Sequence, residues 1–77
     1  MQDAPTPDPE MLMSLMKTEM PFGKYKGILL YKLPVAYLEW FSARGFPKGK
    51  LGMQLQTLYV IKLNGLEDIL RRLAGQI

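Results

Sequence analysis

The middle of the chain reads Met20-Pro21-Phe22-Gly23-Lys24-Tyr25-Lys26-Gly27, then Leu33-Pro34, then Tyr37-Leu38-Glu39-Trp40-Phe41, and then Gly45-Phe46-Pro47-Lys48-Gly49-Lys50-Leu51-Gly52. This pattern places glycines, lysines and aromatic residues in two short loops on either side of one helix. Glycine permits sharp turns and close approach of the backbone, and folding alone gives the lysines between these glycines little reason to gather there. The stretch therefore predicts the order of the elements and indicates a place where something anionic binds.

The size and composition of the chain exclude several classes of protein. Its 77 residues fit one domain, whose core supplies only about 3–5 kcal/mol of net stability. Cysteine and histidine are both missing from the sequence, so disulfides, thiolate zinc sites, cysteine nucleophiles and histidine bases are excluded. Residues 1–10 are acidic and proline-rich, unlike a signal peptide, and no span approaches the roughly 18 apolar residues of a membrane helix. We expect a soluble, cytoplasmic protein.

The net charge of +3 is unevenly distributed along the chain. Residues 1–16 carry three acidic and no basic side chains, whereas residues 17–77 carry ten basic side chains against four acidic ones. A basic body of this kind attracts phosphates, acidic lipid surfaces or acidic proteins, although solubility alone would explain a milder asymmetry.

The amino-terminal residues divide into two parts. Residues 1–8 are predicted to be a disordered lead, because they are rich in proline and have little to bury, and residues 9–77 are predicted to form a single compact domain. A helix is expected to begin at Pro9, with Asp8 as its cap. Its apolar residues, which are Met11, Leu12, Met13, Leu15 and Met16, cover much of its circumference. The helix must therefore dock onto this chain or onto another.

The next elements are defined by glycine and proline. Two short apolar runs, residues 20–22 and 28–30, flank the loop of residues 23–27 and predict a small β-hairpin that packs against helices. Pro34 is expected to open a helix that ends at Gly45. Tyr37, Leu38 and Phe41 share one face of that helix, and Trp40 lies at the border of this face.

Two more helices complete the expected fold. Residues 50–63 have apolar positions at helical intervals and stop at Asn64-Gly65. Asn64 and Glu67 are then spaced like a capping box for a last helix that ends before Gly75. The buried stripe predicted for this last helix consists of Leu66, Ile69, Leu70 and Leu73. The predicted fold class is mainly α with a small β-hairpin (α+β), with about four helices around one core.

The second loop departs from the usual rules for a helix start. Lys48 and Lys50 lie where the helix dipole disfavours positive charge, and Gly49 takes the place of a capping side chain. Free amides and two ammonium groups at one helix end favour a phosphate or a carboxylate. The alternative is that both lysines point into solvent at a cost of a few tenths of a kcal/mol. The loop is not a nucleotide-binding P-loop, because it lacks the serine or threonine that holds magnesium.

The first loop combines Lys24, Tyr25 and Lys26 between glycines. This combination suits contacts to backbone phosphates together with stacking on a base. The alternative is that solvated lysines at a hairpin tip discourage edge-to-edge aggregation. Both basic loops flank the same aromatic helix, which favours a common binding surface.

Three further residues belong to the candidate anion-binding set. Trp40 and Arg44 are four positions apart on a helix, so the guanidinium can lie over the indole, although the favoured role of Trp40 is that of a core or core-edge residue. Lys62 falls within an apolar helix face, where its ammonium can extend to the surface, pair with Glu39 or reach a bound anion. The four acidic residues of the body form no evident acid–base or metal-binding pair, and we expect no catalytic residue, no metal and no cofactor.

The motifs quoted above, together with Ile61-Lys62-Leu63-Asn64-Gly65-Leu66, resemble a family of small bacterial proteins labelled "putative quorum-sensing-regulated virulence factors". The resemblance covers about residues 11–73. It implies a bacterial source and a compact helical domain with a small hairpin, and it implies no enzymatic reaction.

A shorter part, residues 22–40, also resembles the accessory domain at the end of exodeoxyribonuclease-X-like enzymes. That resemblance covers less than half of the chain. The nuclease itself and its metal-binding carboxylates are missing, so the resemblance implies only a contact to nucleic acid through Lys24, Tyr25 and Lys26.

Two functional hypotheses follow from the sequence. The first is a non-enzymatic module that binds DNA, RNA or another phosphate-bearing partner through the basic loops. The second is a module for protein interaction or self-association, in which Met11, Leu12 and Met16 of the first helix fill a groove in the partner. Neither involves a membrane, and the sequence leaves the oligomeric state open.

Overall fold

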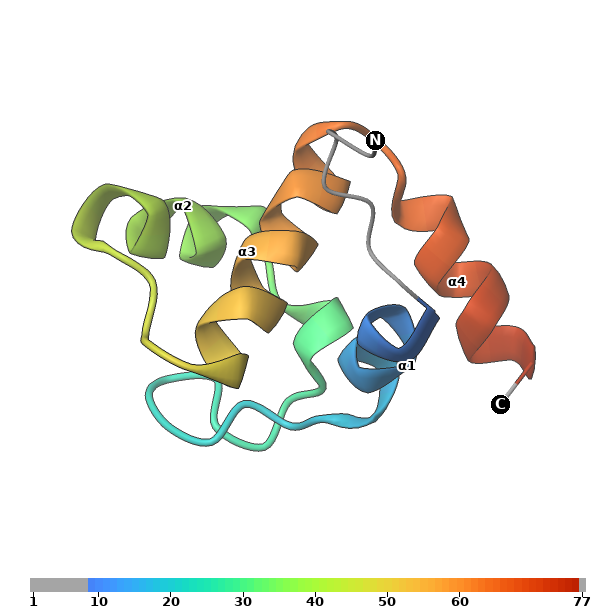
Figure 1. The fold of residues 1–77 in the computed structure, drawn as a ribbon, viewed down its shortest axis with the longest axis horizontal. Helices are drawn as coiled ribbons and strands as arrows, with labels where there is room; N and C mark the ends of the chain where they lie inside the picture. Colours follow the sequence, from blue (N-terminus) through green and yellow to red (C-terminus); the bar gives the residue numbers. More distant parts are fainter. Residues whose placement is uncertain (1–8, 77) are drawn as a thin grey trace, which may run out of the picture.

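The computed structural model describes residues 9–76, so the predicted disordered lead and the Asp8 cap lie outside the described residues. The elements are α1 (Pro9–Lys17), the 3-10 helix η1 (Leu30–Lys32), α2 (Val35–Arg44), α3 (Lys50–Leu63) and α4 (Glu67–Gln76). Figure 1 shows α3 in the middle, α2 on one side of it, and α1 and α4 on the other. Over the range it describes, the chain is an all-α domain of four helices.

The predicted β-hairpin is wrong, because residues 9–76 contain no strand. A lone antiparallel bridge joins Glu19 to Leu29, and the amide of Gly27 donates to the carbonyl of Met20 at 2.8 Å. Regular pairing does not continue past Met20, because the amide of Ile28 donates to the carbonyl of Tyr25 at 3.0 Å and not back to Met20. Beyond the bridge the backbone winds into η1. The segment is therefore a closed loop between helices, and the α+β prediction is corrected to all-α.

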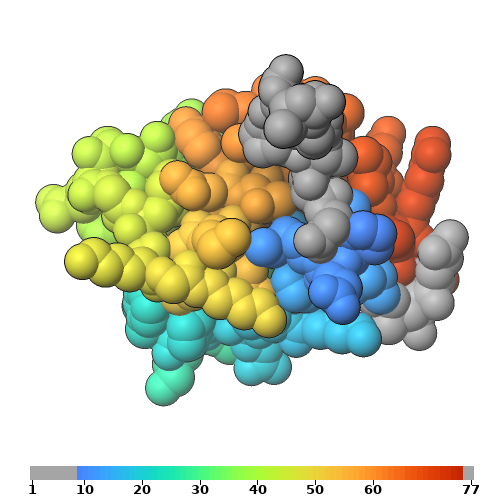
Figure 2. All heavy atoms as spheres, viewed as in Figure 1, coloured from blue at the N-terminus to red at the C-terminus, as the bar shows by residue number. Residues whose placement is uncertain are grey.

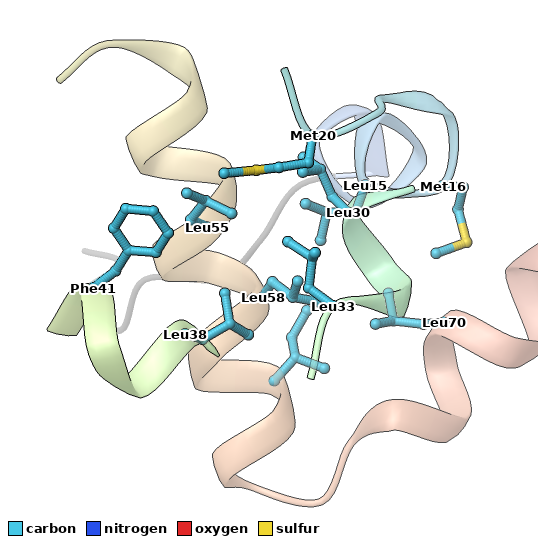
Figure 3. Close-up of a cluster of buried hydrophobic side chains, with 11 residues drawn as sticks. Leu15, Met16, Met20, Leu30, Leu33, Leu38, Phe41, Leu55, Leu58 and Leu70 are labelled. Carbon is cyan, nitrogen blue, oxygen red and sulfur yellow. The ribbon is translucent and has the colours of Figure 1, made fainter. Parts of the chain in front are cut away.

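One core holds the helices together, and α3 supplies its centre (Figure 3). The buried apolar residues are Leu15, Met16, Met20, Leu30, Leu33, Leu38, Phe41, Leu55, Leu58, Ile61 and Leu70. Every helix and the segment between α1 and α2 contribute to this set. The helical periodicity predicted for α2 and α3 is confirmed.

Helix α1 docks onto its own chain. Leu15 is fully buried, Met16 is 4 % exposed, and the helix contacts α4, η1 and α3. The amide of Gln54, on α3, donates to the hydroxyl of Ser14 at 3.1 Å and to that of Thr18 at 3.4 Å. Met16, which the second hypothesis assigned to a partner, is thus part of the protein's own core.

The turn between α3 and α4 corrects two expectations. The side-chain amide of Asn64 donates to the carbonyl of Val60 at 2.8 Å, so Asn64 caps the end of α3 and does not form a capping box with Glu67. Of the predicted α4 stripe, Leu70 is buried and Leu73 partly buried, whereas Leu66 and Ile69 are exposed because α4 packs mainly against α1. Helix α4 also continues through Gly75.

Candidate functional site

An open groove of about 520 Å³ lies between the first loop and α2. Its lining residues are Phe22, Lys24, Tyr25, Ala36, Tyr37, Trp40 and Phe41. Phe22, Lys24 and Tyr25 come from the loop and the other four residues come from α2, where their spacing of three or four positions places them along one side of the helix. Five of the seven lining residues are aromatic, so the groove presents mainly ring surfaces.

The aromatic rings of the groove brace one another. The ring centroids of Tyr25 and Tyr37 are 4.6 Å apart, and Tyr37 and Trp40 have nearly parallel rings at 6.5 Å. Phe41 contacts both rings, with its centroid 5.1 Å from those of Tyr37 and Trp40. The network then continues into the domain, because Phe41 stacks on Phe46 at 6.2 Å. The aromatic wall of the groove is consequently anchored in the core.

Gly23 allows the first loop to approach α2 closely. Its φ of 81° lies in the left-handed region, and a Cβ atom at this position would lie 2.9 Å from the Tyr37 hydroxyl oxygen. Met20, directly before the loop, is buried in the core. These two constraints hold the loop residues of the groove over the aromatic helix.

Two cations border the aromatic rings. The Arg44 guanidinium lies over the Trp40 ring at 4.8 Å from its centroid, a contact that their spacing of four positions allows. The Lys24 ammonium lies 5.5 Å from the centroid of Tyr25. None of the described residues that line the groove is acidic. Such an environment favours a ligand that combines negative charge with a flat ring.

The Tyr37 hydroxyl remains protonated near neutral pH. Burial raises the pKa of Tyr37, and the neighbouring Tyr25 raises this pKa further. The phenol is therefore available as a neutral hydrogen-bond donor or acceptor beside Gly23.

Trp40 is more exposed than a core residue. Its side chain is half exposed, at 50 %, although its ring contacts Tyr37, Phe41 and Arg44. Trp40 is therefore a core-edge residue and not a core residue. Part of its indole remains accessible from the groove.

The second basic loop does not line this groove. Lys48 and Lys50 are exposed around Gly49, which precedes α3 with a φ of 83° and provides no side-chain cap. Phe46 connects this loop to the groove wall through Phe41. Figure 2 shows both loops on one face, with residues 45–50 in yellow above residues 20–28 in cyan. The groove is therefore lined by the first loop and α2 alone, and the second basic loop contributes no residue to it.

The remaining predicted residues lie elsewhere or outside the lining. The Lys62 ammonium pairs with the Glu67 carboxylate at 3.1 Å, not with Glu39, and its side chain is only 10 % exposed. Lys26 is exposed in the first loop but does not line the groove. Within residues 9–76, no three acidic, histidine or cysteine side chains gather into a group able to hold a metal ion. Over the same residues, no helix is long and apolar enough to cross a lipid bilayer.

Sequence reasoning missed two residues of interest. Phe22 is 44 % exposed and lines the groove, whereas the sequence assigned it to a hairpin strand. Its position directly before Gly23 was the available signal, because a large apolar residue next to a loop glycine is easily exposed. Gln54 is the only buried polar residue among those described. Its spacing of three positions from Leu51 and four from Leu58 was the available signal, because it places Gln54 on the apolar face of α3.

Fold and groove together define a small helical domain with an aromatic, basic-rimmed surface groove. Residues 8–73 match the model of a family described as "Putative quorum-sensing-regulated virulence factor", and the chain belongs to this family. It is 46 % identical over 65 residues to "Uncharacterized protein YpeB" of Escherichia coli strain K12, which covers 83 % of this chain and 90 % of that protein. The protein of the same name from Escherichia coli O157:H7 matches with the same values. No solved structure matches the chain.

Proposed function

We propose that this protein is a non-enzymatic module that binds nucleic acid or another phosphate-bearing partner. The observation that carries the proposal is the groove, in which five aromatic side chains lie beside the Lys24 ammonium and no lining residue is acidic. Arg44 adds a second cation at the Trp40 ring. Aromatic rings with interspersed cations are the usual means of holding bases and phosphates together.

The basic body of the protein supports the same proposal. Lys26, Lys48 and Lys50 are exposed and supply positive charge outside the groove. Lys62 is left out of the proposed site, because its ammonium is already paired with Glu67 and largely buried. The partial resemblance of residues 22–40 to an accessory domain of nuclease-like enzymes agrees with this proposal only by analogy.

The salt dependence of binding tests the proposal. Labelled single- and double-stranded DNA and RNA are titrated with the protein, and fluorescence anisotropy is measured at about 50 and about 200 mM salt. We expect the logarithm of the binding constant to fall linearly with the logarithm of salt concentration, by about 0.7 to 0.9 per neutralised phosphate.

A double variant identifies the contributing lysines. Lys24→Gln with Lys26→Gln should weaken binding and reduce the salt slope by about one per lost phosphate contact. The matched control is Lys17→Gln with Arg72→Gln, which removes the same charge from exposed positions on α1 and α4. The proposal is wrong if no nucleic acid binds at low salt, or if the control weakens binding as much as the loop variant does.

A further inference from the structure

We infer that the groove holds an unpaired base, so that the protein selects single-stranded over double-stranded nucleic acid. This inference rests on the proposed function and specifies the form of its ligand. Within a duplex both faces of each base are covered by neighbouring base pairs, and a base reaches an aromatic pocket only when it is unpaired or extruded. A groove made of ring surfaces therefore selects against an intact duplex.

The two walls of the groove offer accessible rings. Phe22, from the loop, is 44 % exposed, and Trp40, from α2, is 50 % exposed. Large aromatic side chains usually contribute to the core of so small a domain, so the exposure of these two in one groove requires an explanation. Stacking on a base would cover the apolar ring area that they leave in contact with water.

The volume and rigidity of the groove suit a ligand of this size. About 520 Å³ lies within the range of small-molecule sites, which is roughly 300–1,000 Å³. The contacts of Tyr37 and Trp40 with buried Phe41 fix the wall before any ligand arrives. A preformed wall lowers the entropic cost of binding.

The charges distinguish a base from other ligands of aromatic grooves. A methylated ammonium group would require rings without competing cations and normally a nearby carboxylate, but here Lys24 and Arg44 lie 5.5 and 4.8 Å from ring centroids. A proline-rich peptide uses aromatic grooves without needing these cations. Phosphates on either side of a stacked base use both the rings and the cations, and the observations favour this ligand.

The single tryptophan allows a direct test. Trp40 is the only tryptophan in the chain, so intrinsic fluorescence reports on the groove itself. The full chain is titrated with an oligothymidylate of about 15 nucleotides and with a duplex of the same length, while anisotropy measures binding in parallel. We expect the single strand to bind roughly tenfold more tightly than the duplex and to quench Trp40 emission, because only an unpaired base stacks on the ring.

Variants of Trp40 assign the effect to the ring. Trp40→Leu should weaken single-strand binding roughly ten- to a hundredfold, whereas Trp40→Phe should retain most of the affinity. Leu63→Ala is the control, because Leu63 has a similar exposure, at 56 %, and lies outside the groove. Circular dichroism before each titration verifies that every variant is folded.

The outcomes separate this inference from the proposed function. Equal affinity for single strand and duplex, or binding of the single strand without quenching of Trp40, overturns the inference and leaves the proposed function in place. Failure of both nucleic acids to bind overturns the proposed function as well. Quenching by a proline-rich peptide but by neither nucleic acid would show that the groove is a peptide site and would overturn both.

Discussion

Gly52 shows how a single residue fixes the start of α3. The residue is buried in the first turn of the helix, and a Cβ atom at this position would overlap the carbonyl oxygen of Pro47. Glycine normally weakens a helix by about 0.5–1 kcal/mol relative to alanine, but here only glycine leaves room for the preceding loop. The path of the second basic loop therefore depends on a missing methyl group.

We expect Gly52→Ala to destabilise the domain by about 1–3 kcal/mol, because the loop or the helix must shift to accept the methyl group. For a domain of this size each kcal/mol lowers the melting temperature by roughly 4–8 °C, which thermal unfolding followed by circular dichroism would detect. Gly75→Ala is the matched control, since a Cβ there has no heavy atom of the described residues within 4 Å apart from those of its chain neighbours and its own helix backbone. Equal melting temperatures for the two variants would contradict the close contact at Pro47.

At the scale of elements, the junction of α3 and α4 combines a helix stop that the local sequence predicts with an ion pair that only the tertiary structure shows. The Asn64-Gly65 stop is confirmed, because the amides of Gly65 and Leu66 donate to the carbonyls of Lys62 and Ile61, as in a Schellman motif. The sequence could not show that Lys62 and Glu67 pair across this turn, since that contact depends on the direction in which the chain leaves it.

Glu67→Gln should lower the free energy of unfolding by about 1–2 kcal/mol, because it leaves the largely buried Lys62 ammonium without its carboxylate. This value lies between those of exposed and buried ion pairs. Asp68→Asn is the control. It removes a charge from the same first turn of α4 but breaks only the exposed pair with Arg71, so we expect no measurable change. Urea unfolding of both variants measures the difference, and equal losses would mean that the helix dipole, not the ion pair, is responsible.

At the scale of the whole molecule, four helices share one core and leave the aromatic groove on the surface. Burial of Leu15 and Met16 shows that the apolar face of α1 stabilises its own domain. The hydrogen bonds from Gln54 to Ser14 and Thr18 then fix α1 against α3. The sequence predicted that α1 must dock but left its partner open.

If α1 is a core element, Met16→Ala should destabilise the domain by about 2–5 kcal/mol, because it leaves a cavity. Met53→Ala is the control, as Met53 is 59 % exposed and its truncation should change stability by less than about 0.5 kcal/mol. Unfolding curves and light scattering after size exclusion give the stability and the oligomeric state. A dimer that Met16→Ala converts into an equally stable monomer would restore the self-association hypothesis for this helix.

The sequence by itself determined the positions of the four helices and the buried periodicity of α2 and α3, and it allowed the stacking of Arg44 on Trp40. These features depend on residues at most a few positions apart, whose relative placement the helical backbone fixes. It also determined that residues 20–30 turn back on themselves, although it predicted strands where the turn at Tyr25–Ile28 and η1 leave only one bridge.

Only the tertiary structure decided that Phe22 and Lys24 lie across from Trp40, that Lys48 and Lys50 lie outside the groove, and that Lys62 pairs with Glu67. These contacts join different elements, and the angles between elements result from packing the whole core at once. No short stretch of sequence determines these angles, because the neighbours of each side chain depend on how the apolar faces of all the helices pack together.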